Sequence, residues 1–155
     1  MTARRLTSGE WSQLSPGLAE ALAALNVTPQ IEDRPHFAAR LARLRFGSIP
    51  VLALGKTIWW PKARGDFSGT SQMAVLQHEL QHVLDFAEGR LTVLGYLILP
   101  RNWTYRWQLT DELSWSRLGA EQRASAAEAL WRSEQSNATR VTARLRELIP
   151  WARSR

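Results

Sequence analysis

Two of the three histidines in this 155-residue chain stand four residues apart, within the segment VLQHELQHVLDFAEG (residues 75–89). The motif reads His78-Glu79-Leu80-Gln81-His82, and apolar residues recur around it at intervals of three and four. This spacing predicts an amphipathic helix from about Thr70 to Ala87, with both histidines on one face. The predicted core face carries Met73, Leu76, Leu80, Val83, Leu84 and Ala87.

Histidines in this arrangement have the chemistry of a metal site. Imidazoles one helical turn apart can each direct a ring nitrogen at one cation, and zinc takes nitrogen ligands at roughly 2.0–2.1 Å. Glu79 follows the first histidine, where it can act as general base towards a water at the metal. By composition alone this motif is expected only about 0.004 times in a chain of this length. The residues therefore predict a Zn²⁺ site with His78 and His82 as ligands.

The third protein ligand, which a catalytic zinc requires, is less evident from the segment itself. His36, the remaining histidine, lies in a polar, proline-flanked stretch and is interpreted as a surface residue. Glu88 points away from the metal face if the helix continues to it. Asp85 stands where the pattern HExxHxxGxxH has the glycine that turns the chain towards a third histidine.

A second amphipathic helix is predicted in RLGAEQRASAAEALWR (residues 117–132). Its polar face carries Glu121 and Glu128, which lie about 10 Å apart along a helix axis, so only one of them can bind the metal. The alternative for each is a solvated glutamate on a helix face, and Glu128 is interpreted in that way.

The other elements follow from periodicity, turn residues and prolines. We expect helices over 7–25, capped by Thr7 or Ser8 and interrupted at Pro16, and over 35–46. Two strands joined by a tight turn are expected within 49–61, and a polar loop precedes the motif helix. The remaining expectations are an extended or partly stranded segment over 90–100 and a helical stretch over 111–148, broken near 136–137.

Composition limits the class of protein. The length predicts a single domain over 1–155, and the absence of cysteine excludes disulfides and thiolate metal sites. The longest apolar run is about half of what a membrane span needs, and the N-terminus has no secretory signal pattern. A cytoplasmic protein without a membrane partner is expected, although export without an N-terminal signal stays open. The charge of +6 comes from dispersed basic residues, so a nucleic-acid partner is not expected.

Five stretches carry a family resemblance in their order and spacing: LTSGEW, TIWWP, VLQHELQHVLDFAEG, TYRWQL and RLGAEQRASAAEAL. Together they resemble the small zincin-like bacterial proteins described as Vgr-related, and more distantly the ImmA/IrrE-like proteases. The resemblance implies an α+β zincin-like fold, with a small sheet packed on the HExxH helix and a C-terminal helical part. It also implies that Glu121 is the third zinc ligand, as in gluzincins. The family's acidic residue four positions later is Ser125 here.

The function implied is that of a zinc-dependent metallopeptidase acting on a peptide or protein substrate. Tyr105, next to Arg106, is the candidate donor to a tetrahedral oxyanion, with ordinary packing or surface exposure as the alternative. Trp59 and Trp60 lie either in a strand that pairs with an extended substrate or in the core. The rival function is a catalytically inactive zincin-like module, binding or structural, associated with a secretion or injection assembly.

Overall fold

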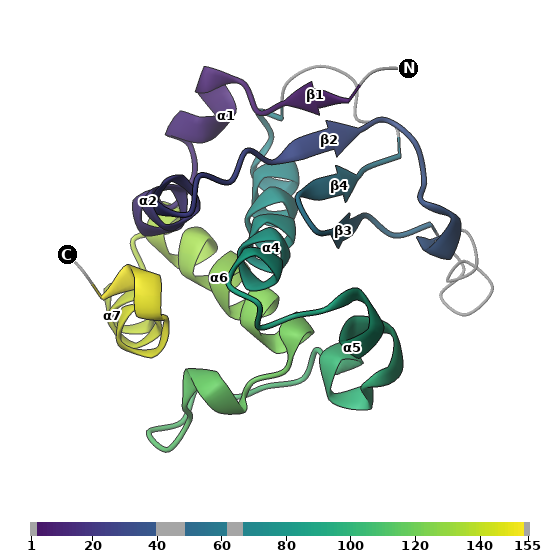
Figure 1. The fold of residues 1–155 in the computed structure, drawn as a ribbon. Coiled ribbons are helices and arrows are strands. Elements are labelled where there is room, and N and C mark those ends of the chain that lie inside the picture. Colours follow the sequence, from purple (N-terminus) through teal and green to yellow (C-terminus); the bar gives the residue numbers. More distant parts are fainter. Residues whose placement is uncertain (1–2, 40–48, 62–66, 154–155) are drawn as a thin grey trace.

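The computed structural model describes residues 3–39, 49–61 and 67–153, and within them it is an α+β structure (Figure 1). A small mixed sheet has the strand order β1-β2-β4-β3, in which β2 and β4 are parallel and the outer pairs antiparallel. The strands are β1 (Arg4–Arg5), β2 (Gln30–Glu32), β3 (Leu52–Leu54) and β4 (Thr57–Trp59). The longer helices are α2 (Pro16–Ala24), α4 (Thr70–Ala87), α6 (Ala120–Gln135) and α7 (Thr139–Leu148). None of the helices in these ranges combines the length and apolar character needed to cross a lipid bilayer.

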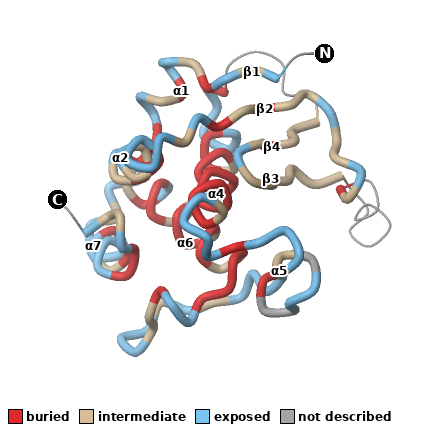
Figure 2. Tube along the Cα trace, viewed as in Figure 1, coloured by how far each residue is buried: buried red, intermediate tan, exposed pale blue. Residues whose placement is uncertain are grey.

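Helix α4 is the centre of the fold, and its predicted bounds are confirmed. It packs against β3 and β4 on one side and against α6 on another. Figure 2 shows α4 buried along most of its length. The predicted core face is buried except for Ala87, and the polar residues Gln77, Gln81 and Asp85 are buried as well. The face that carries the histidines is therefore covered by α6 rather than by solvent.

Two other local predictions are also confirmed. Residues 52–59 form the predicted pair of antiparallel strands, and Gly55 takes the positive φ of 59° that the tight turn between them requires. The N-terminal helix divides at Pro16 into α1 (Ser8–Ser12) and α2. Thr7 caps α1, since its side chain accepts a hydrogen bond from the backbone N–H of Glu10.

The expectation for residues 90–100 was wrong in its secondary structure. Val93–Ile98 form a short helix, α5, followed by the 3₁₀ turn η1 (Pro100–Trp103). The Thr92 side chain caps α5 by accepting a hydrogen bond from the N–H of Gly95. This local cap, together with the absence of any strand beside the segment among the described residues, outweighs the β-propensity of its apolar side chains.

The helical stretch expected over 111–148 begins later than predicted. Residues before Ala120 are irregular apart from the 3₁₀ turn η2 (Trp115–Arg117), and the break near 136–137 is confirmed between α6 and α7. The N–H of Gly119 is bound by the Gln122 side chain, which sets the start of α6 at Ala120. The helix expected over 35–46 begins at Phe37, and its part beyond residue 39 lies outside the described residues.

A buried carboxylate holds the N-terminal elements together. Glu10 accepts two hydrogen bonds from the Arg4 guanidinium, at 2.7 and 2.8 Å, and others from the backbone N–H groups of Thr7 and Phe67. Burial alone would raise the pKa of this carboxyl. The hydrogen bonds, of which those from Arg4 are the largest, outweigh burial and lower the pKa below its ordinary value.

We expect Glu10→Gln to destabilise the fold by about 1–3 kcal/mol near pH 7, because the backbone N–H groups of Thr7 and Phe67 and the Arg4 guanidinium lose a charged acceptor. A lowered folded-state pKa gives stability that is present above the unfolded value of 4.5 and is lost as the pH falls through the folded value. The difference between the wild type and Glu10→Gln should therefore shrink below about pH 4.5. Thermal unfolding from pH 3 to pH 7 measures this difference. The exposed Glu147→Gln is the control, and a difference that does not vary with pH would contradict the assignment.

Candidate metal centre

The two histidines of α4 meet one carboxylate from α6. His78 Nε2 lies 3.0 Å from Glu121 Oε2, and His82 Nε2 lies 3.4 Å from Glu121 Oε1. One donor atom from each of the three residues lies within 4.8 Å of the other two. His82 and Glu121 are buried, and His78 is nearly so. The predicted set of His78, His82 and Glu121 is thus brought together and is compatible with a bound cation.

The spacing of these atoms is compatible with a bound metal ion. Two ligand atoms of one tetrahedral zinc, each about 2.1 Å from the ion, lie about 3.4 Å apart. The histidine nitrogens lie 3.0 and 3.4 Å from the two different oxygens of Glu121, and one donor atom from each residue lies within 4.8 Å of the others. Two imidazole nitrogens and one carboxylate oxygen are also a donor set that zinc accepts, with one position left for water or substrate.

Electrostatics within the cluster favour a positive charge between the three groups. Burial alone would lower the pKa of His78, but its hydrogen bonds to Glu121 and Glu128 outweigh burial and raise the pKa to about 10. Burial alone would raise the pKa of Glu121, and its contacts with the two histidines instead lower it well below the ordinary range. A cation bound here would replace the proton on His78, because only a neutral imidazole is a ligand.

Glu79 lies beside the cluster, in contact with the sheet. Its carboxyl is buried, and it accepts a hydrogen bond from the backbone N–H of Ala53 in strand β3. Burial is the largest influence on its pKa and raises it, while the two neighbouring histidines act in the opposite direction. A carboxyl with a raised pKa is closer to the neutral range in which general bases work best.

Two tyrosines reach the same carboxylate from the segment after α4. The Tyr96 hydroxyl donates a hydrogen bond to Glu121 Oε1, and burial is the main reason for its raised pKa. Tyr105, the predicted oxyanion donor, also bonds Glu121, and its ring stacks beside that of His78 with centroids 6.3 Å apart. Sequence reasoning missed Tyr96 because the apolar run that contains this residue is predicted to be extended. The only sequence signal is Thr92 as a helix cap, which places Tyr96 in the first turns of a helix.

The interpretation of Glu128 as a solvated helix-face residue was wrong. Its Oε2 lies 3.4 Å from His78 Nδ1, on the side of the ring opposite to Glu121. Its Oε1 accepts hydrogen bonds from Arg132 Nε and Nη2, at 2.9 and 2.8 Å. The two glutamates are seven residues apart, which is close to two helical turns, so they share one face of α6. That face is covered by α4, and for this reason Glu128 is not fully in solvent.

The three alternative candidates for the third ligand have other partners outside the cluster. His36 stacks against Trp59, with ring centroids 5.0 Å apart, and its Nδ1 accepts the N–H of Ala38. Glu88 pairs with Arg90 at the end of α4. Asp85 is buried in an ion pair with Arg123 at 2.8 Å.

The strand that carries the tryptophans is not at the edge of the sheet. Strand β4 lies between β2 and β3, so its backbone groups are used on both sides. Trp60 stacks on Phe67 at 4.1 Å and packs against the core. Among the described residues the edge next to the metal cluster is β3, whose Ala53 contacts Glu79. Because β4 is an inner strand, it has no free edge with which to pair with a peptide.

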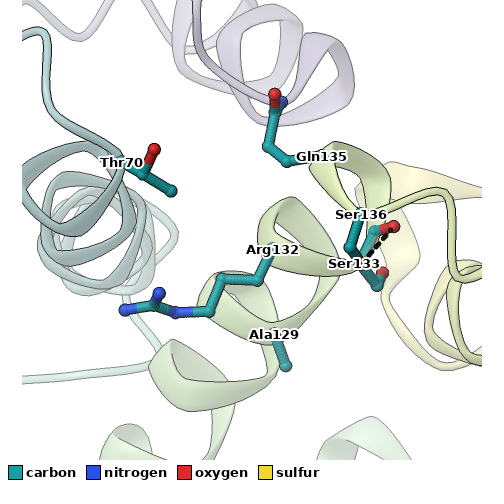
Figure 3. A pocket seen from close by; sticks show the side chains of 6 residues that line it. All are labelled: Thr70, Ala129, Arg132, Ser133, Gln135 and Ser136. Carbon is teal, nitrogen blue, oxygen red and sulfur yellow. Dashed lines mark hydrogen bonds between the residues drawn. The ribbon is translucent and has the colours of Figure 1, made fainter.

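A shallow hollow lies near the cluster but does not include its residues. Figure 3 shows its lining side chains, with Arg132 extended from α6. They are Thr70, Ala129, Arg132, Ser133, Gln135 and Ser136. Arg132, one of the lining residues, donates to Glu128, which in turn faces His78.

Comparison of the chain with protein-family models finds no match, and comparisons with curated proteins and with solved structures find no significant match. The structure itself shows an α+β fold in which His78, His82 and Glu121 form a group that could hold a metal ion.

Proposed function

We propose that the protein is a zinc-dependent peptidase of gluzincin type. The observation that carries the proposal is the convergence of His78, His82 and Glu121, from two helices, with one potential ligand atom of each within 4.8 Å of the others. A zinc ion bound by these side chains supplies a Lewis acid that polarises a peptide carbonyl and lowers the pKa of an attacking water. The chain's own residues supply the remaining chemistry.

Glu79 has the role of general base in this proposal. It follows the first histidine on α4, it is buried beside both histidines, and its pKa is raised mainly by burial. Its carboxylate would take a proton from the attacking water and return it to the leaving amine. Tyr105 is 57% exposed, but partial burial of its hydroxyl and the neighbouring Glu121 carboxylate raise its pKa, so it keeps its proton as a hydrogen-bond donor that can stabilise an oxyanion.

Strand β3 gives the proposal a substrate class. It is the sheet edge nearest to the cluster among the described residues, and the N–H of Ala53 points towards Glu79. An extended peptide added to this edge would pass the catalytic glutamate with its backbone aligned. We therefore propose a peptide or protein segment in extended conformation as the substrate.

The first test of the proposal is metal content. Protein purified without chelator is expected to contain close to one zinc per chain, and the double variant His78→Ala/His82→Ala is expected to contain none. His36→Ala is a matched control, since it removes the third histidine, which lies outside the cluster. Elemental analysis after zinc loading and dialysis gives the result. A wild type that stays metal-free under these conditions would refute the proposed function.

A further inference from the structure

His78 is held between two carboxylates of the same helix. Glu121 faces its Nε2 at 3.0 Å, and Glu128 faces its Nδ1 at 3.4 Å. If Nε2 binds the metal, Nδ1 carries the proton, and the Glu128 carboxylate is in position to accept a hydrogen bond from it. The buried His82 has no equivalent support, since its Nδ1 has no hydrogen-bond partner in the described residues. The two histidine ligands are thus held unequally.

Glu128 is itself fixed by a second contact. Arg132, one turn further along α6, donates from Nε and Nη2 to Glu128 Oε1. Oε2 is left to face His78. With one oxygen bound by each neighbour, the carboxylate has little freedom to rotate away from the imidazole. Arg132, Glu128 and His78 form a continuous chain that begins at the half-exposed guanidinium and ends at the metal cluster.

We propose that Glu128, anchored by Arg132, is a positioning residue that orients the His78 ring so that its Nε2 faces the metal. A carboxylate that accepts the outer N–H of a ligating histidine fixes the ring and increases its basicity. The inference rests on the proposed function only in requiring a metal at the cluster.

Zinc affinity of Glu128→Ala is the main test. Loss of an outer contact of this kind typically weakens metal affinity about 10–100-fold, and we expect a loss in this range. Glu128→Gln retains an acceptor oxygen without the charge and should lose less. Glu88→Ala is a closely matched control, because Glu88 pairs with Arg90 rather than with a proposed ligand. Its side chain is 28% exposed, against 26% for Glu128. Competition with a zinc-chelating dye ranks the three variants.

A second readout separates positioning from general stability. In the zinc-loaded wild type the Nδ1 proton of His78 should be visible by NMR and protected from exchange with solvent. Glu128→Ala should lose that signal, whereas Glu88→Ala should keep it. The metal-free forms of the two variants should have the same thermal stability. If the wild type binds zinc and Glu128→Ala matches Glu88→Ala in affinity and in this signal, the positioning role is refuted while the proposed function stands. A wild type without zinc would overturn both.

Discussion

Glu79→Gln is expected to bind zinc like the wild type and to lose peptide hydrolysis by at least about 100-fold, the lower end of what a general base contributes. The substitution keeps the shape of the side chain and its acceptor oxygen for the N–H of Ala53. It removes only the ability to take a proton. Because Glu79 is outside the group of three ligands, the metal should remain.

The measurement combines a zinc determination with hydrolysis of a mixed peptide library, with and without chelator. Glu88→Gln is the control, since it makes the same chemical change at the end of the same helix without contacting the cluster. Activity that survives in Glu79→Gln would refute catalysis through this residue. A zinc-loaded wild type that cleaves no peptide of the library would instead support the rival function, an inactive zincin-like module.

The second large effect is expected at the third ligand. Glu121→Ala should weaken zinc affinity by more than the roughly 10–100-fold that outer contacts contribute, because two histidines leave the ion under-coordinated. Glu121 is buried against both histidines, so its removal also takes away the charge that balances them. Glu121→Gln keeps the side-chain volume and one acceptor oxygen. This variant therefore distinguishes loss of the charged ligand from a simple folding defect.

Dye competition on these variants and on Glu88→Ala tests the choice of helix directly. The gluzincin arrangement requires the large loss at Glu121, on α6, and none at Glu88, which caps the C-terminal end of α4. The opposite ranking would mean that the ligands come from one contiguous segment and that α6 is only scaffold. Circular dichroism of the metal-free variants establishes whether each one is folded before its affinity is compared.

Properties that depend on neighbours in sequence were predictable. The rise of 1.5 Å per residue and 3.6 residues per turn place His78 and His82 on one face of any helix that contains them. The turn at Gly55 and the cap at Thr7 also depend on a few adjacent residues. The choice of Glu121 over Glu88 followed from helix direction together with the family resemblance, and the structure brings Glu121 to both histidines.

Properties that depend on which surfaces pack together were decided only by the tertiary structure. The helical period shows that Glu121 and Glu128 share a face, but a polar face has the same pattern whether it meets water or another polar face. Here that face meets α4, so Glu128 reaches His78 and Glu121 is buried. Tyr96 and the edge position of β3 depend likewise on contacts between distant segments. By itself the sequence determined the pair of histidines and their spacing, while the packing of α6 on α4 decided which carboxylates surround them, because burial is a property of the assembled fold.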